Sequence, residues 1–330
     1  MRADQRGGTI RFALFLWAVV AARAQQAGVT QAGERFVVDT NVACHVDPNL
    51  ASATADRVPL GSMMHVTRTV QIDGTGWYFD GWRVTSSRPV CWVYGPNTFV
   101  WDGKDPKALA LEILNHALAR KGAKLNDYVE AENFLLATVP GWRLPPGGIQ
   151  ISGLLGFRYL QVLDRALASA DRNVGMGGNP LQEAWIEGHG GLVEYFEPGA
   201  LWHVPASRYW TLLEANKDAV WVEELAWVAA SLPIYGDECY SECLLDSVLA
   251  GPAQYWKRFP SGLHITEALG LAAPQIQQAA AGACQPGFEE DSLVHRQVVT
   301  DVRGSLSSVT SSGKGQVLKF LDDIERKCRK

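Results

Sequence analysis

The amino-acid sequence predicts a multidomain chain in which a small all-β barrel precedes a larger, mostly α-helical domain. Residues 35–103 contain short runs of β-branched and aromatic residues separated by turn residues. From residue 104 onward, apolar residues recur with helical periodicity. The chain of 330 residues also exceeds the usual size of a single hydrophobic core. These observations predict a barrel over residues 35–103 and a helical domain over residues 104–330.

The first residues have the pattern of a secretory signal peptide. Three arginines precede an apolar run over residues 12–22, and Ala22-Arg23-Ala24 provides a cleavage signature. We expect a signal peptide over residues 1–24 and a linker over residues 25–34. The apolar run is far shorter than the ~20 apolar residues that a membrane span needs, and no later segment reaches that length. The mature chain is therefore expected in the periplasm or outside the cell, with no transmembrane span.

The charge of the chain gives no indication of a nucleic-acid partner. Removing the signal peptide takes away four arginines and one aspartate, so the formal net charge falls from −5 to −8. A nucleic-acid-binding surface requires clustered basic residues, which this acidic chain lacks.

All six cysteines follow the predicted cleavage site, and an even number in an oxidising compartment predicts disulfides. Six cysteines allow fifteen pairings, but their spacing favours three bonds that each stay within one region. Residues four apart on a helix are too distant for a disulfide, so the first cysteine of the close pair is expected just before a helix that starts near Ser241. A metal or redox site is the alternative there, although no histidine lies nearby in the sequence. The favoured pairs are Cys44 with Cys91, Cys239 with Cys243, and Cys284 with Cys328.

The helical domain begins at Asp105, a helix-capping residue that is followed by proline. Asn126 is expected to cap the second helix, and the adjacent Glu223 and Glu224 to lie on a solvated helix face. Further helices are expected over residues 127–137, 152–170, 180–187, 207–216, 218–231, 241–259, 263–273, 292–305 and 316–327, with two extended segments over 193–196 and 201–204. Aromatic residues and short turns between these helices are typical of α-solenoids. The stretch Tyr255-Trp256-Lys257-Arg258-Phe259-Pro260, with Gly262 and Ala268, resembles half of a tetratricopeptide (TPR) hairpin, so we expect a degenerate TPR-like domain.

The N-terminal segment resembles the bacterial SH3-like (SH3b) domain over about 65 residues. The resemblance implies a small β-barrel that binds or targets cell-wall material and has no catalytic residues. Cysteine replaces the usual arginine after Asn-Val and the usual glycine before Trp-Val. A bond between these cysteines would join the first and last strands of the barrel and contribute about 4 kcal/mol on the chain-entropy model. The matching motifs are Asn41-Val42-Ala43-Cys44, Asp47-Pro48, Leu60-Gly61 with Val66, Gly76-Trp77-Tyr78 and Cys91-Trp92-Val93.

Five aromatic residues of the barrel segment have two interpretations. Most of them are expected to fill the small core, because a small fold uses its aromatic residues in packing. The alternative is an aromatic groove for a peptide or glycan. The five residues are Trp77, Tyr78, Trp82, Trp92 and Tyr94.

The stretch Ile186-Glu187-Gly188-His189-Gly190-Gly191 resembles the loop in which zinc-dependent cell-wall amidases present their first histidine ligand. The resemblance implies a hydrolase in which His189 binds zinc, and Glu194 and His203 are the available further ligands. Their spacings do not match that family, and a glycine-rich structural turn is the simpler interpretation.

Together these patterns predict an exported, non-catalytic binding or scaffold protein of the bacterial cell envelope. No catalytic residue and no cofactor are expected. The expected partner of the helical domain is a protein or peptide, and cell-wall material is the candidate ligand of the barrel. The zinc-dependent amidase remains the alternative.

Overall fold

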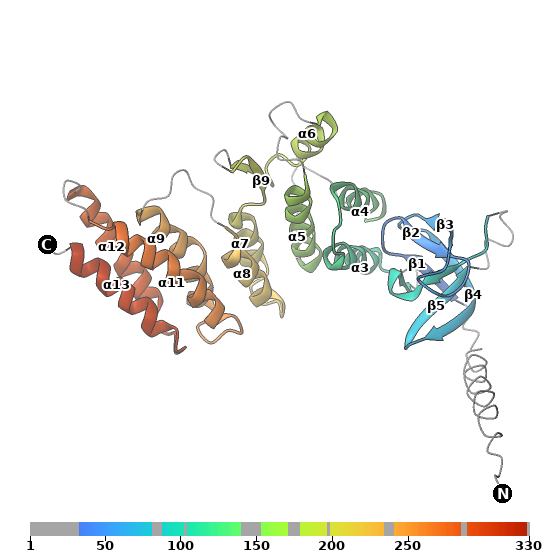
Figure 1. Ribbon diagram of the computed structural model, residues 1–330. Helices are drawn as coiled ribbons and strands as arrows, with labels where there is room; N and C mark the ends of the chain where they lie inside the picture. The colour runs from blue at the N-terminus through green and yellow to red at the C-terminus, as the bar shows by residue number, and fades with distance from the viewer. Residues whose placement is uncertain are drawn as a thin grey trace, which may run out of the picture. The chain divides into compact units, whose positions relative to one another are not determined.

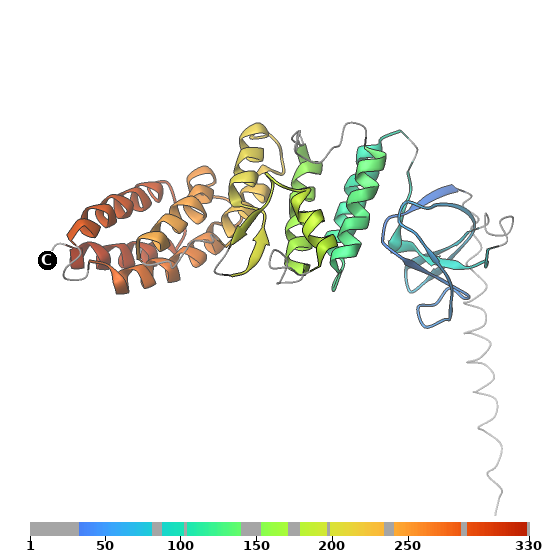
Figure 2. The same ribbon diagram turned by 90° about the horizontal axis from the view of Figure 1, so that it is seen from above.

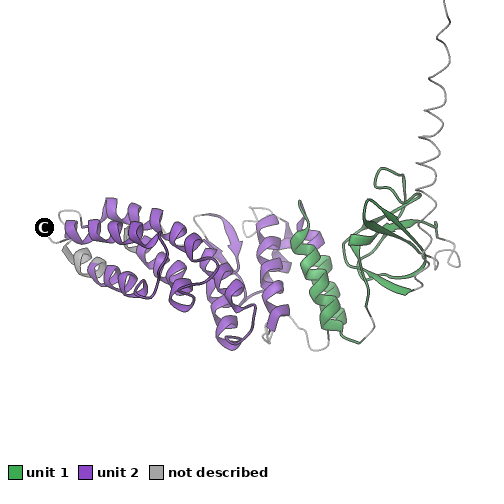
Figure 3. Cartoon of the chain, turned by 90° about the horizontal axis from the view of Figure 1, so that it is seen from below, with its two compact units in different colours: residues 1–121, 129–140 green, residues 122–128, 141–330 purple. Residues whose placement is uncertain are grey.

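The computed structural model describes residues 33–80, 88–101, 104–139, 153–170, 179–196, 199–233, 241–284 and 289–328. Figure 1 labels the helices and strands, and Figure 3 shows the two compact units into which the chain divides. Unit 1 contains residues 1–121 and 129–140, and unit 2 contains residues 122–128 and 141–330. The predicted signal peptide lies outside the described residues. The predicted domain limits stay a prediction.

Unit 1 is built on a seven-stranded antiparallel sheet with the strand order β3-β2-β6-β5-β4-β1-β7. Alternation of buried and exposed side chains along β4 reflects the period of two that places successive residues on opposite faces. The strands are β1 (Gly33–Val37), β2 (Val42–His45), β3 (Thr54–Val58), β4 (Met63–Ile72), β5 (Thr75–Asp80), β6 (Trp92–Tyr94) and β7 (Thr98–Phe99), with a 3-10 turn η1 (Gly95–Asn97) before β7.

The prediction of a closed SH3-like barrel is wrong, because the sheet is open. The strands β3 and β7 form its two edges and do not pair with each other. In a closed barrel every strand forms hydrogen bonds on both sides, so the two outermost strands must pair with each other. The strand β7 has two residues and pairs only with Phe36 and Val37 of β1, so it has too little length to close the sheet.

One face of the sheet carries a buried core that includes the first disulfide. Cys44 and Cys91 are bonded, as predicted. The bond joins β2 to the residue before β6, and these two strands are direct neighbours. The expectation that it would join the first and last strands is therefore wrong. The core residues are Val37, Val42, Cys44, Val58, Met64, Cys91 and Val93.

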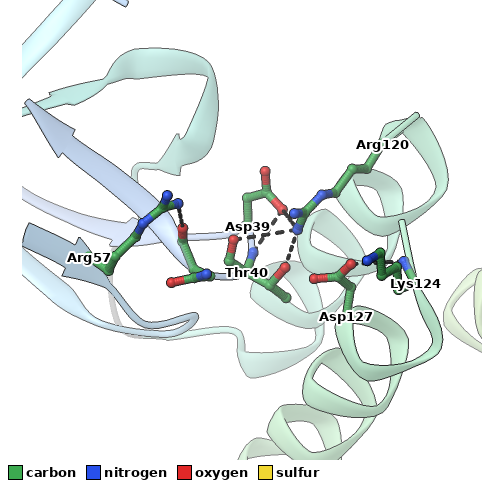
Figure 4. A network of polar contacts seen from close by, with 7 residues as sticks. Asp39, Thr40, Arg57, Arg120, Lys124 and Asp127 are labelled. Atoms are coloured by element: carbon green, nitrogen blue, oxygen red, sulfur yellow. Dashed lines mark hydrogen bonds and ion pairs between the residues drawn. The ribbon is translucent and has the colours of Figure 1, made fainter. Parts of the chain in front are cut away.

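Two helices follow the sheet. In α3 (Pro106–Ala119), the Asp105 carboxylate accepts a hydrogen bond from the Lys107 backbone N–H, which confirms the predicted cap. The helix α4 (Leu125–Thr138) starts earlier than expected. Asn126 lies inside it, and the Asp127 carboxylate accepts from the Lys124 backbone N–H, as in a capping box (Figure 4). The predicted Asn126 cap is therefore wrong.

A second core cluster packs α3 and the adjoining part of α4 against the strands within unit 1. Its buried residues are Val38, Leu109, Ile113 and Ala131. At the end of α3, the Arg120 guanidinium donates to the Asp39 carboxylate at 3.0 Å and to the Thr40 hydroxyl (Figure 4). In unit 1, the helices thus pack against the sheet, and the end of α3 is bonded to the turn between β1 and β2.

Unit 2 is mostly helical, and Figure 2 shows its helices packed one after another in chain order. The predicted helix over residues 241–259 is divided at Gly251, because Pro252 begins a new helix there. The predicted helix over 263–273 is longer and continues through Pro274. Both predicted extended segments form strands. The elements are α5 (Gly153–Ser169), α6 (Pro180–Glu187), β8 (Glu194–Phe196), β9 (Leu201–His203), α7 (Ala206–Ala215), α8 (Val222–Ser231), α9 (Ser241–Ala250), α10 (Pro252–Arg258), α11 (Ile265–Gly282), α12 (Glu289–Ser305) and α13 (Lys314–Cys328).

The C-terminal helices are held by packing and by a second disulfide. The helix α11 lies against α9 and α13, and the Trp256 indole N–H of α10 donates to the Ser305 hydroxyl of α12 at 2.8 Å. Cys284, just beyond α11, is bonded to Cys328 of α13, as predicted. No helix in the described part of the chain is long and apolar enough to cross a membrane.

Candidate functional site

The aromatic side chains of β5 and β6 are divided between the two faces of the sheet. In the register, Trp77 pairs with Tyr94 and Phe79 pairs with Trp92, whereas Tyr78 pairs with Val93 of the core. Residues paired across strands share a face. Trp77, Phe79, Trp92 and Tyr94 therefore lie together on the face opposite the core, and we call these four residues the aromatic shelf.

In the aromatic shelf, the two residues of β5 are buried and the two residues of β6 are more exposed. Trp77 and Phe79 are 3% and 8% exposed, whereas Trp92 and Tyr94 are half-buried. The Trp77 and Tyr94 rings meet edge to face with centroids 5.2 Å apart, and those of Phe79 and Trp92 with centroids 5.1 Å apart. This geometry is favourable for aromatic pairs, so the rings hold one another in place.

Two basic side chains border the aromatic shelf. On β4, the Arg68 guanidinium carbon lies 3.7 Å from the Phe79 ring centroid and 5.6 Å from that of Trp92. Arg68 is exposed, and no acidic side chain of the described residues pairs with it. On β2, the His45 ring lies 5.6 Å from the Trp77 ring, and its Nδ1 is 3.1 Å from the Ser52 carbonyl oxygen. Because that carbonyl can only accept, Nδ1 carries the proton.

The predicted aromatic groove is thus brought together only in part. Trp77, Trp92 and Tyr94 belong to the aromatic shelf. Tyr78 lies on the core face beneath Arg35, whose guanidinium carbon is 4.0 Å from the Tyr78 ring centroid and whose pKa is lowered by burial. Trp82 lies outside the described residues.

Phe79 and Arg68 were missed by the sequence analysis. The alternation of Trp77 and Phe79 along one strand was a usable signal for Phe79. No local pattern indicates Arg68, because a β-bulge after Val66 shifts the register that brings it onto this face.

His189 does not have the surroundings of a zinc ligand. Its side chain is fully buried, and its Nδ1 lies 2.6 Å from the Trp185 carbonyl oxygen, to which it donates. The ring centroids of His189 and Trp185 are 4.4 Å apart. This histidine closes the turn after α6, which agrees with the structural interpretation of the glycine-rich stretch.

The other two alternative ligands lie on the small β8–β9 hairpin. Glu194 and His203 are cross-strand partners. Burial lowers the pKa of His203, and the nearby Glu194 carboxylate partly opposes this shift. Among the described residues, no three His, Cys, Asp or Glu side chains are close enough to hold a metal ion, so the alternative set of His189, Glu194 and His203 is not assembled.

The close cysteine pair is only half described. Cys243 lies in α9 and takes part in a disulfide. Cys239 lies outside the described residues, so its bond to Cys243 stays a prediction.

A hollow with a volume of about 600 Å³ lies between α11 and α13. Its charged groups are already engaged. The Lys327 ammonium donates to the Ala280 and Ala281 carbonyls, and Arg326 pairs with Asp323. Within the described ranges, Arg68 beside the aromatic shelf has no such partner, so we consider the aromatic shelf the stronger candidate site.

Comparisons of the chain with protein-family models, with curated proteins and with solved structures find no match.

Proposed function

We propose that the chain is an exported, non-catalytic binding protein of the bacterial cell envelope and that the aromatic shelf is its ligand-binding surface. The observation that carries this proposal is the pair of half-buried rings, Trp92 and Tyr94, each held edge to face by a buried aromatic ring, beside Arg68, which has no acidic partner among the described residues. Aromatic and arginine side chains in such rigid positions are typical of binding hot spots.

The described disulfides support export. Cys44–Cys91 and Cys284–Cys328 are of the kind that persists in oxidising compartments. They agree with the predicted signal peptide over residues 1–24.

We also propose that the helical unit, with its TPR-like pattern, binds a protein or peptide partner. Support comes from helices that pack in succession with short turns, as between α10 and α11. No observation favours the alternative of a zinc-dependent amidase, since His189 is buried in a turn.

Co-sedimentation of the purified mature chain with isolated cell-wall sacculi tests the proposal. We expect the wild type to sediment with the sacculi and the variant Trp92→Ala/Tyr94→Ala to lose about tenfold or more in affinity, because each truncation of a hot-spot ring costs over ~1 kcal/mol. Trp210→Ala is the matched control, because Trp210 is a half-buried tryptophan in unit 2 that contacts Arg258.

Circular dichroism and the melting temperature establish that each variant is folded. Equal sedimentation of the folded double variant would remove the aromatic shelf as the binding surface. A wild type that stays in solution would contradict attachment to cell-wall material.

A further inference from the structure

We propose that the ligand of the aromatic shelf is a saccharide that bears a carboxylate group and that Arg68 binds this carboxylate. This inference rests on the proposed function, because it names the chemistry of the ligand at the same surface.

The position of the Arg68 guanidinium suits the binding of an anion. Its guanidinium lies over the Phe79 ring and near Trp92, so one face of its plane is covered by aromatic carbon. The five N–H groups of a guanidinium lie in one plane and form a fork of donors. They match the geometry of a carboxylate, which accepts two parallel hydrogen bonds.

A second exposed arginine that lies over an aromatic ring, among the residues that the structure describes, shows the contrast. In unit 2, Arg258 lies 5.1 Å from the Trp210 ring centroid, but it also pairs with the Glu214 carboxylate at 2.9 Å. Its charge is therefore neutralised within the protein. In a chain with a formal net charge of −5, an anionic ligand is repelled at long range and needs a local cation such as Arg68.

The position of the aromatic shelf within the sheet excludes a peptide that adds to it as a further β-strand. The strand β6 lies between β2 and β5, and β5 lies between β6 and β4. Their backbone groups are engaged on both sides, so no peptide can add to them as a further strand. Recognition on this face must come from side chains alone.

A sugar ring suits this arrangement. Its C–H face packs against an aromatic ring, and Trp92 and Tyr94 offer half-exposed rings fixed by their edge-to-face partners. A carboxylate on the same or the next sugar would then reach the Arg68 guanidinium beside Trp92. The surface thereby combines apolar stacking with one charge-assisted contact.

The test is isothermal titration of the mature chain with two tetrasaccharides. The first alternates glucuronic acid with N-acetylglucosamine, and the second contains N-acetylglucosamine only. We expect the acidic tetrasaccharide to bind about tenfold or more tightly, since a hydrogen bond to a charged group contributes over ~1.4 kcal/mol. Arg68→Gln should abolish this preference but keep the affinity for the neutral sugar, and the control Arg258→Gln should change neither.

Other outcomes overturn the inference. Equal binding of both sugars by the wild type, or an unchanged preference in Arg68→Gln, would remove the role of Arg68. Binding of tetraglutamate in place of either sugar would identify an acidic peptide as the ligand. The sacculus assay with Trp92→Ala/Tyr94→Ala decides the proposed function separately, because it does not depend on Arg68.

Discussion

Gly61 has a left-handed backbone conformation with φ of +74° and lies directly against the Phe134 ring. A Cβ atom at this position would lie 2.1 Å from a ring carbon of Phe134. That ring packs against the cluster of Val38, Leu109 and Ile113, so it has little freedom to move away. The glycine therefore allows the helices of unit 1 to approach the turn between β3 and β4.

We expect Gly61→Ala to destabilise unit 1 by about 2–4 kcal/mol, from the left-handed backbone and the steric overlap together. The control is Gly74→Ala in the β4–β5 turn, where φ is +78° and no atom lies within 4 Å of the added Cβ. Its cost should be the backbone strain of about 1–2 kcal/mol. Urea unfolding measures both, and equal losses would show that the contact with Phe134 is unimportant.

Asp164 of α5 is a carboxylate in an unfavourable position. Burial raises its pKa, although a hydrogen bond from the Val204 backbone N–H at 3.3 Å and the charge of Arg165 both lower it. The nearby Tyr209 is buried, and its phenol has a raised pKa from burial and from the Asp164 charge. The folded protein therefore disfavours the ionised Asp164 carboxylate relative to the unfolded chain.

The sign of the effect on stability follows from this shift. A raised pKa in the folded state contributes stability below the unfolded value of about 3.9, and this contribution is lost as the pH rises through the folded pKa. Asn cannot ionise and keeps the acceptor for Val204. We therefore expect Asp164→Asn to gain in free energy of unfolding relative to the wild type between pH 4 and pH 7.

Urea unfolding of both proteins at the two pH values measures this difference. The depressed pKa of His203 makes its own contribution fall as the pH drops, but it is common to both proteins and cancels. A stability difference that is the same at both pH values would contradict the prediction.

Glu223 and Glu224 are adjacent in α8, yet they have different roles. The Glu223 carboxylate accepts from the Tyr255 hydroxyl of α10 at 2.8 Å and from the Leu263 backbone N–H before α11. The same hydroxyl accepts from the His264 backbone N–H at 2.9 Å. Three helices are thus joined through one carboxylate, so the interpretation of Glu223 as merely solvated was wrong. Glu224 is largely exposed and pairs with Arg158.

We expect Glu223→Ala to destabilise unit 2 by about 1–3 kcal/mol, because it removes the acceptor of a buried phenol and of a backbone N–H. Glu224→Ala removes only an exposed ion pair and should cost less than about 1 kcal/mol. Thermal unfolding compares the two variants. A larger loss for Glu224→Ala would show that the network does not hold these helices together.

The sequence predicted most elements but not how they assemble. Alternation and periodicity located the strands around Trp77 and Trp92 and most helices, because both signals are local. The closed barrel was wrong because closure depends on whether β3 and β7 meet, and strand lengths alone do not determine that. The division at Gly251-Pro252 was available in the sequence, since a proline at a first helical position follows that glycine.

The aromatic shelf was predictable only in part, for a related reason. Trp77, Trp92 and Tyr94 are conspicuous as residue types. Their separation from Tyr78 depends on the strand register, and the approach of Arg68 depends on the β-bulge. A histidine such as His189 has the same local sequence whether it binds zinc or closes a turn, and only its burial distinguishes the two.

At the scale of the whole molecule, each described disulfide links residues of the same unit. The sequence separations are 47 and 44 residues. On the chain-entropy model, each such bond contributes about 4 kcal/mol, which is a large part of the roughly 5–15 kcal/mol of a typical domain. Each unit should therefore depend on an oxidising compartment for its stability.

We expect the full chain, expressed with its own leader, to be exported, cleaved before Gln25 and free of thiols. After reduction and alkylation each unit should melt at least about 10 °C lower, and the smaller unit 1 should shift more, because about 4 kcal/mol is lost in each unit. The variants Cys44→Ser/Cys91→Ser and Cys284→Ser/Cys328→Ser assign the loss to unit 1 or unit 2. Mass spectrometry, thiol titration and calorimetry supply the measurements. An unprocessed N-terminus would contradict export by this leader, and an unchanged melting temperature after reduction would show that packing alone stabilises both units.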